Sequence, residues 1–314
     1  MNMKFEKAVR KKAKLRLALT GPSGSGKTLS ALLLAKGIGA SIAVLDSERD
    51  SASLYAEPIS LPGGVVIEPP EFDSLSLGAP YTPERYIEAI RAAEQAGYGT
   101  LIIDSITHEW SGVGGCLELV DEIARAKYKG NSWSAWNDVT PRHRALLDAI
   151  LQSPMHIIVT LRSKTETAQQ EGQNGRKTVV KLGMKAEQRD GFEYEMTVVL
   201  DLTHDGHFAM ATKDRTGLMM GRDPFVIDES VGTSLLAWLE SGAYVPPPQS
   251  GLTEDVLAGH LAALDGATTM AELVDAWNAA QKAARTANDG AALEQLTQRK
   301  DDRKAALAPV QEAA

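Results

Sequence analysis

Cysteine is nearly absent from this chain of 314 residues. Cys116 is its single cysteine, so no disulfide can form within the chain, and a reducing compartment such as the cytoplasm is expected. One Cys and six scattered His also lack the spacing of a zinc site. Cys116 stands in an apolar helical context, which favours a packing role over that of a nucleophile.

Long apolar runs are missing too. No stretch approaches the ~20 apolar residues that span a bilayer, so no membrane segment is expected. The start, residues 1–14, is basic and has no apolar segment of the kind found in secretion signals. These absences favour a cytoplasmic globular protein.

Basic residues are outnumbered, and the net charge is −8. This balance argues against a protein that coats nucleic acid with its whole surface, but it allows a local basic groove. Residues 4–16 carry seven Lys or Arg and one acid, Glu6. We expect this segment to be either a solvated arm or a contact for nucleic acid or a subunit.

Short apolar segments alternate with helical ones over residues 1–243. This order predicts an α/β fold with a mostly parallel central sheet covered on both faces. The last two strands follow without a helix between them, which predicts an antiparallel extension of the sheet. Strands are expected near residues 14–20, 41–46, 64–68, 100–104, 155–161, 194–203 and 207–214, and helices near 27–38, 83–96, 115–127, 141–152 and 231–241.

The composition changes after a Pro-rich linker at residues 244–251. In residues 252–314, 18 of 63 residues are Ala and strand signals are lacking, which predicts a small C-terminal helical module of three segments. Met270, Leu273, Val274 and Trp277 follow the spacing of one helix face. The module is expected either to cap the core or to dock a protein partner.

A phosphate-binding motif lies between a predicted strand and a predicted helix. Backbone N–H groups of such a loop and of the first helical turn face a bound phosphate, and the helix dipole favours negative charge there. Lys27 would reach the β- and γ-phosphates of ATP, and the Thr28 hydroxyl would bind Mg²⁺. The motif consists of Gly21, Pro22, Ser23, Gly24, Ser25, Gly26, Lys27 and Thr28.

Two further carboxylates follow apolar strands. Asp104 ends the strand 100–104, where a side chain points into the crevice in which open α/β sheets bind ligands, so we expect it to be the second Mg²⁺ anchor. A residue that orients the attacking water is also required. Glu48, just past the strand 41–46, and Glu109 are the two candidates.

The segment from Val44 to Asp50, followed by Leu54-Tyr55-Ala56, resembles the region after the P-loop helix in bacterial RecA-type recombinases. The spacing from Tyr81 to Ser105 is similar to that family as well. Over residues 12–241 the pattern looks closest to phage-encoded, single-core RecA/Rad51-like ATPases of recombination and strand annealing. The resemblance implies a RecA-like P-loop NTPase core and gives the water-polarising role to Glu48.

The resemblance also suggests assembly. Lys213 and Arg215, at the end of a late strand, resemble the basic pair with which RecA-like and hexameric helicase-type ATPases reach into a neighbouring subunit's site. There such cations neutralise charge on the transferring phosphate. A charge cluster at a hairpin end is the alternative. The strand 157–162 lacks the family's Asn-Gln pair for sensing the γ-phosphate, which leaves Thr160 and Arg162 as candidates for that role.

DNA contacts are expected from two segments. Residues 163–191 read as a long polar loop with six Lys or Arg against four acids, and the corresponding loop of RecA-like proteins binds single-stranded DNA. Residues 127–136 interleave cations with Trp133 and Trp136, which suits base stacking. The same two tryptophans could instead anchor the following helix to the core.

Taken together, the sequence predicts a cytoplasmic ATPase that uses ATP and Mg²⁺, binds single-stranded DNA and self-associates as a ring or filament. Two other classes remain open. One is an ATP-gated adaptor or loader with negligible hydrolysis, which recruits replication or repair proteins. The other is a P-loop kinase, for which the segment 163–191 offers few arginines for a lid.

Overall fold

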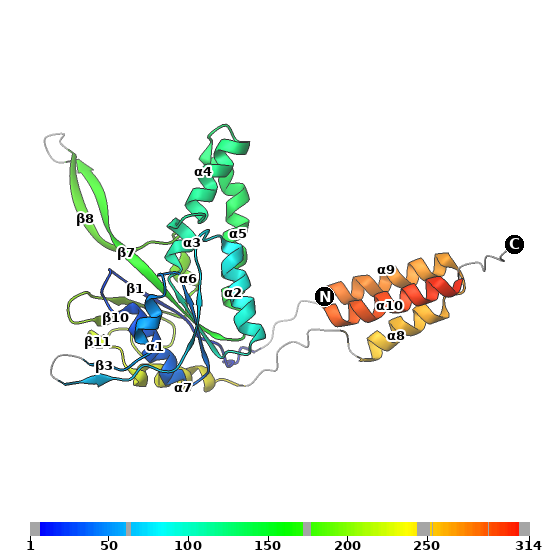
Figure 1. Ribbon diagram of the computed structural model, residues 1–314, viewed down its shortest axis with the longest axis horizontal. Helices are drawn as coiled ribbons and strands as arrows, with labels where there is room; N and C mark the ends of the chain where they lie inside the picture. The colour runs from blue at the N-terminus through cyan, green and yellow to red at the C-terminus, as the bar shows by residue number, and fades with distance from the viewer. Residues whose placement is uncertain are drawn as a thin grey trace. The chain divides into compact units, whose positions relative to one another are not determined.

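The computed structural model describes residues 7–60, 64–171, 177–243, 252, 254–287 and 289–307, with the backbone alone for residues 165–171 and 177–184. The chain divides into two compact units, Met1–Ala243 and Tyr244–Ala314 (Figure 1). The predicted linker 244–251 lies outside the described residues. Each unit is described by itself below.

A mostly parallel sheet forms the centre of the first unit and confirms the predicted α/β fold. Its strands lie in the order β11-β10-β9-β1-β7-β6-β2-β5. The pairs from β9 to β5 are parallel, whereas β9 with β10 and β10 with β11 are antiparallel, as the missing helix between the late strands predicted. The strands span β1 Arg16–Gly21, β2 Ile42–Asp46, β5 Asp73–Ser76, β6 Thr100–Asp104, β7 His156–Glu171, β9 Val198–Leu202, β10 Phe208–Asp214 and β11 Phe225–Val226.

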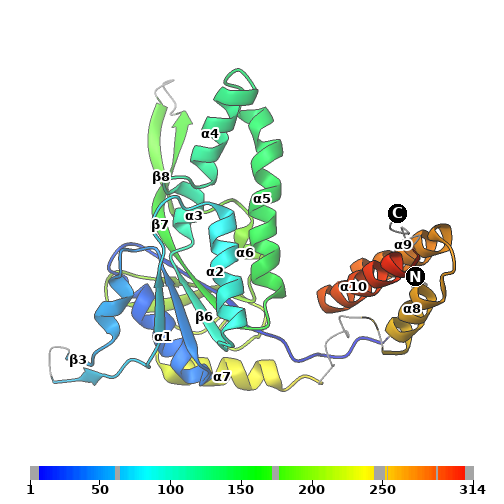
Figure 2. The same ribbon diagram turned by 45° about the vertical axis from the view of Figure 1, so that its right-hand side comes forward.

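Helices cover both faces of this sheet (Figure 2). On one face, α1 Lys27–Ile38 and α7 Glu229–Glu240 pack their apolar residues against β1 and β9. On the other face, α2 Pro83–Gln95 and α5 Ser132–Gln152 pack against β6 and β7. The central strands β1, β2 and β6 are buried along their whole length, as expected for parallel strands covered on two sides.

Two glycines let α1 and α7 approach closely. A Cβ on Gly37 would lie 2.0 Å from the Glu229 carbonyl oxygen, and a Cβ on Gly232 would lie 2.1 Å from the Leu34 carbonyl oxygen. Any side chain at either position would force the helices apart. Helix α1, which carries the P-loop at its start, is therefore held by backbone contact with α7.

Two projections rise beyond the carboxyl end of the parallel strands (Figures 1 and 2). One is a hairpin in which β7 pairs antiparallel with β8 Lys177–Ala186, from Ser163↔Ala186 outward. The segment 163–191, expected to be a loop, is therefore largely two strands. The other is the pair formed by α4 Cys116–Lys127 and the first half of α5, which share a small apolar core.

Some boundaries differ from those expected. Helix α5 begins at Ser132 rather than near residue 141, because Asn131 caps it by accepting from the Ser134 N–H and Pro141 is accommodated inside the helix. The strand expected at 64–68 lies outside the main sheet, in the small pair β3 Ile59–Ser60 and β4 Val66–Ile67. The remaining short elements are η1 Ser51–Tyr55, α3 Thr107–Ser111 and α6 Phe192–Glu195.

The basic N-terminal segment packs on the end of α7. The Lys12 N–H donates to the Ala243 carbonyl at 3.1 Å, and the Ala243 N–H donates to the Arg10 carbonyl at 2.7 Å. The Arg10 guanidinium lies 4.0 Å from the centre of the Trp238 ring. Part of the expected arm is thus attached to the core within its own subunit.

The described residues of the second unit form three helices, α8 Glu254–Gly266, α9 Met270–Thr286 and α10 Gly290–Leu307. They enclose their own apolar core, which includes Leu264, Leu273 and Leu296. Thr269 and Glu272 form a capping box at the start of α9. Within the described part of the chain, no helix combines the length and the apolar character needed to cross a membrane.

Candidate functional site

The loop between β1 and α1 has the backbone shape of an anion cradle. Gly24 and Gly26 adopt positive φ of 77° and 86°, a conformation that disfavours residues with a side chain. No side chain among the described residues caps α1, and its first turn carries no acid. The N–H groups at the start of α1 are therefore available to an anion.

Lys27 folds back over this loop. Its ammonium donates to the Gly21 carbonyl at 3.0 Å and to the Pro22 carbonyl at 2.8 Å. Burial lowers the pKa of Lys27, while Asp104 and Glu48 act in the opposite direction. A bound phosphate is a stronger partner for an ammonium than two carbonyl groups, so Lys27 is available to bind one.

Asp104 lies at the carboxyl end of β6, beside Thr28. The Thr28 hydroxyl donates to Asp104 Oδ2 at 2.6 Å, and the Thr160 hydroxyl donates to Oδ1. Burial raises the pKa of this carboxyl group, which is 2% exposed. The Thr28 hydroxyl and the Asp104 carboxylate thus place two oxygen atoms together at a buried position where a negative charge is disfavoured. Such a pair fits Mg²⁺, a cation that prefers oxygen ligands.

Glu48 reaches the same cavity from the loop after β2. Arg162, from β7, donates through Nε to Glu48 Oε1 at 2.9 Å and through Nη2 to Oε2, and this pair raises the pKa of Arg162. Because β7 lies between β1 and β6, its residues at the sheet edge fall between the P-loop and Asp104. The cavity, of about 450 Å³, is lined by Lys27, Thr28, Glu48, Tyr55, Asp104 and Arg162 among others.

Glu109 lies elsewhere. Its side chain is fully buried beneath α5, where Oε1 is 3.0 Å from both Cys116 Sγ and His143 Nδ1. Gln188 donates to its other oxygen at 3.3 Å. Of the two glutamates weighed from the sequence, only Glu48 lines the P-loop cavity. Cys116 is also buried, and burial raises the pKa of its thiol, which fits the predicted packing role.

Lys213 and Arg215 do not line the P-loop cavity of their own chain. Lys213 Nζ donates to the carbonyls of Glu193 and Tyr194, at 2.8 and 2.6 Å. Arg215 donates to the Tyr194 carbonyl at 2.9 Å. The two cations therefore stand together on the surface near α6, away from the predicted ATP site.

Two histidines of the β9–β10 connection lie over the P-loop, and the sequence analysis missed both. A Cβ on Gly24 would lie 3.3 Å from His204 Nε2, and a Cβ on Gly26 would lie 3.5 Å from His207 Nδ1. The two histidines follow the loop by about 180 residues, so no local sequence pattern links them to it.

Trp133 and Trp136, left open between two roles, differ from each other in the structure. Trp136 stacks on Trp110 at a centroid distance of 5.6 Å, and it packs against the small core of α4 and α5. Trp133 is 86% exposed. The anchoring role therefore describes Trp136, whereas Trp133 leaves its ring on the surface.

Comparisons with known proteins place these features in context. A family model described as an AAA domain matches residues 13–224, more than half of the chain. The crystal structure of the RadB recombinase is similar over 70% of this chain and 90% of its own, with 18% sequence identity and a TM-score of 0.38. No curated protein matches the chain.

Proposed function

The chain belongs to the AAA domain family, and we propose that it is a RecA-like ATPase of the cytoplasm that acts on single-stranded DNA in recombination, annealing or repair. One observation carries the ATPase part. Lys27, Thr28, Asp104 and Glu48, which come from three separate segments, line one cavity. These are the residue types that phosphoryl transfer from ATP to water requires.

In the proposed mechanism, the N–H groups of the P-loop and Lys27 bind the β- and γ-phosphates. Thr28 and Asp104 would hold Mg²⁺, which neutralises charge on the phosphates when it is bound. Asp104 is pre-positioned for this by the hydroxyls of Thr28 and Thr160. The P-loop residues Gly21, Pro22, Ser23, Gly24, Ser25 and Gly26 supply the cradle.

Glu48 would orient the attacking water and accept its proton. Its carboxylate is held by the Arg162 guanidinium, so this residue sets where Glu48 points. The same guanidinium lines the cavity and can instead contact a γ-phosphate, which would release Glu48 to the water. Lys213 and Arg215, which lie away from their own site, would complete the site of a neighbouring subunit in a ring or filament.

A second candidate function is the ATP-gated adaptor with negligible hydrolysis. The bidentate Glu48–Arg162 pair favours it, because a carboxylate engaged in such a pair is a poor base for water. The C-terminal helices would then recruit a protein partner.

The test is ATP turnover with and without single-stranded oligonucleotide. The ATPase proposal expects hydrolysis that DNA stimulates and that Lys27→Ala abolishes, since Lys27 contacts the transferred phosphate. Lys36→Ala is the matched control, because Lys36 lies on the same helix but bonds to Glu229 and to the Glu68 carbonyl instead. ATP binding without turnover would establish the adaptor, and full turnover in Lys27→Ala would refute the site.

A further inference from the structure

A hollow of about 540 Å³ lies on the helical projection, apart from the P-loop cavity. We call it the Trp hollow. Its walls come from α3, from one face of α5 and from the segment that follows β8. It is lined by Trp110, Trp133, Trp136, Asn137, Thr140, Pro141, Arg144 and Arg189.

Three tryptophans line the hollow: Trp110 and Trp136 stack on each other, and the ring of Trp133 is exposed. Trp110 and Trp136 stack at an interplanar angle of 23°, and Arg189 lies 5.4 Å from the centre of the Trp136 ring. Trp133, one turn earlier on α5, has no ring or cation stacked on it among the described residues. A Trp that is 86% exposed beside a cavity is an unused stacking surface.

The charge of the hollow is opposite to that of the whole chain. Although the net charge is −8, the lining contains two Arg and, among the described residues, no acid. Arg189 donates to the Thr140 hydroxyl at 3.3 Å and pairs with no described carboxylate. Arg144 is exposed and makes neither a hydrogen bond nor an ion pair with the described part of the chain. The hollow therefore attracts an anion.

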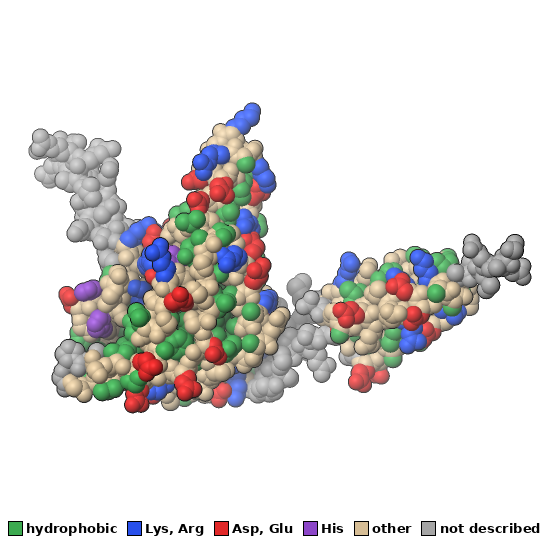
Figure 3. Space-filling view, in the orientation of Figure 1, with side chains coloured by type: hydrophobic (Ala, Val, Ile, Leu, Met, Phe, Trp, Pro, Cys, Tyr) green, Lys and Arg blue, Asp and Glu red, His purple; other side chains and the backbone are tan. Residues whose placement is uncertain are grey.

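We propose that the Trp hollow binds single-stranded DNA by stacking an unpaired base on Trp133 and holding the adjoining phosphates with Arg144 and Arg189. This inference rests on the proposed function and names a site for it. A flat ring beside two guanidinium groups fits a base with its phosphate, because every base has a π-face and every nucleotide a negative charge. Figure 3 shows Lys and Arg side chains interspersed with Asp and Glu at the outer end of the helical projection.

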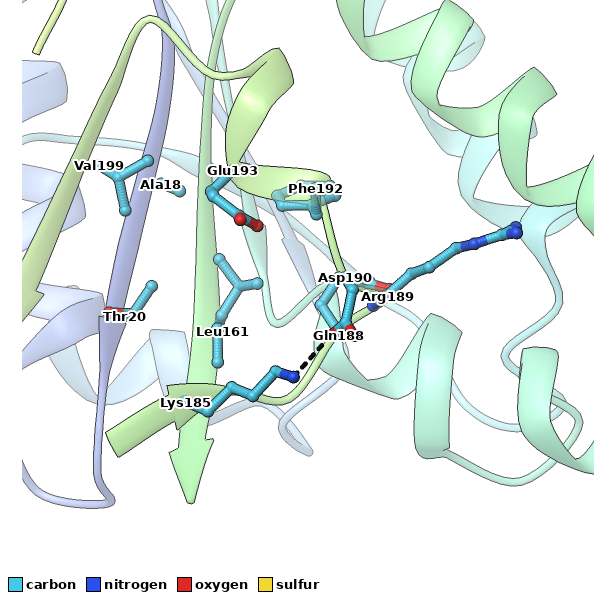
Figure 4. Close-up of a pocket in the computed structure, with 11 residues that line it drawn as sticks. Ala18, Thr20, Leu161, Lys185, Gln188, Arg189, Asp190, Phe192, Glu193 and Val199 are labelled. Atoms are coloured by element: carbon cyan, nitrogen blue, oxygen red, sulfur yellow. Dashed lines mark hydrogen bonds and ion pairs between the residues drawn. The ribbon is translucent and has the colours of Figure 1, made fainter. Parts of the chain in front are cut away.

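The foot of the hairpin joins this site to the ATP site. Figure 4 shows Arg189 directed away from a neighbouring small pocket, in which Lys185 pairs with Asp190, and toward the adjacent helices. The residue before it, Gln188, donates to the Ile106 carbonyl and to Glu109, both at 3.3 Å. Ile106 follows Asp104 by two residues. The proposed DNA site is therefore one residue away from a side chain that contacts the segment following Asp104.

The first experiment separates stacking from charge. Fluorescence anisotropy compares the binding of labelled oligo(dT) and of an abasic oligonucleotide of equal length to the full chain. Trp133→Ala is expected to weaken oligo(dT) binding about tenfold, within the range for losing one stacked base, and to leave abasic binding unchanged. Trp133→Phe should restore most of the loss. Equal losses on both oligonucleotides, or no loss, would overturn the proposal.

The second experiment tests the cations. Arg144→Ala should weaken both oligonucleotides and reduce the slope of log affinity against log salt by about 1. Arg91→Ala is the control, since Arg91 is exposed on α2 and does not line the hollow, and it should bind like the wild type. Thermal unfolding checks that each variant is folded.

The two proposals fail in different ways. If the wild type binds no oligonucleotide, both the DNA function and this site are refuted. If the wild type binds and DNA stimulates its hydrolysis, but Trp133→Ala and Arg144→Ala bind equally well, the proposed function stands and the Trp hollow is refuted. In that case the hollow remains open to a protein segment.

Discussion

Among single residues, Glu48 and Glu109 show how environment decides the role of a carboxylate. Both follow buried strands, and both are candidates from the sequence. Glu48 is 23% exposed at its side chain and lies in the P-loop cavity, whereas Glu109 is fully buried and has hydrogen-bonding groups on both of its oxygens. A base for water needs access to water, so the two should respond differently to the same substitution.

We predict that Glu48→Gln binds ATP but loses turnover by about 100-fold or more, as expected for the loss of a general base. Glu109→Gln should instead lower the free energy of unfolding by about 2 kcal/mol, because its new NH₂ group meets donors where an acceptor is needed. Turnover assays and urea unfolding of both variants check this. Loss of turnover in a fully stable Glu109→Gln, with Glu48→Gln active, would reverse the assignment.

His156 makes stability depend on pH. Its ring is buried, its Nδ1 accepts from the Leu15 N–H at 3.2 Å, and Lys14 Nζ lies 3.4 Å from Nε2. Burial, with Lys14 and Arg16 adding to it, lowers its pKa from 6.5 to about 4. Between these values the unfolded chain binds more protons than the folded one, so stability falls as the pH drops.

We predict that protonation of His156 lowers the free energy of unfolding by up to about 3 kcal/mol as the pH falls from 6.5 to 4. His156→Gln should flatten the stability curve in that window, measured by urea unfolding at several pH values. A parallel shift of the whole curve in His156→Gln, without a change of slope, would show that its titration does not matter.

At the scale of elements, the contact between α1 and α7 depends on the absence of two side chains. We predict that Gly232→Ala destabilises the first unit by about 2 kcal/mol, since its Cβ would meet the backbone of α1 and the helices would have to separate. Gly259→Ala, in open space on α8, should be neutral or stabilising. Thermal unfolding compares the two, and equal effects would contradict the close approach.

The elements that were predictable carry local signals. Pro83 after Thr82 marks the start of α2, and the buried strands β1, β2 and β6 consist mostly of apolar residues. The edge strand β5 was missed because all four of its residues are exposed, so no alternation of apolar and polar residues marks it. Its pairing with β2 is a long-range backbone interaction that leaves no local pattern.

The hairpin was read as a loop for a related reason. The segment 163–186 is rich in polar residues and projects beyond the sheet, so its strands need no apolar face toward a core. By contrast, the P-loop and Asp104 were predictable from motif and spacing. The Arg162–Glu48 pair and the proximity of His204 to Gly24 arise only when distant segments meet, and single-sequence patterns do not encode such meetings.

Across the whole molecule, the residues proposed to be catalytic are divided between two places. The P-loop, Asp104 and Glu48 lie together, while Lys213 and Arg215 stand near α6 and donate to backbone carbonyls there. If these cations complete the site of a neighbouring subunit, one chain alone is an incomplete enzyme. Two inactive variants with different defects should then regain ATP turnover when they are mixed.

We therefore predict that Lys27→Ala and the double variant Lys213→Ala/Arg215→Ala are each inactive. An equal mixture of the two should regain about a quarter of wild-type turnover. When subunits assemble at random, an intact P-loop lies next to an intact basic pair in about one site of four. Mixing Lys27→Ala with Asp104→Asn is the control. Both of these defects lie in the same site, so no pairing of subunits restores a complete one. Turnover of the first mixture no higher than that of its components would show that the basic pair does not act between subunits, and the surface near α6 would then be a charge cluster at the end of a hairpin.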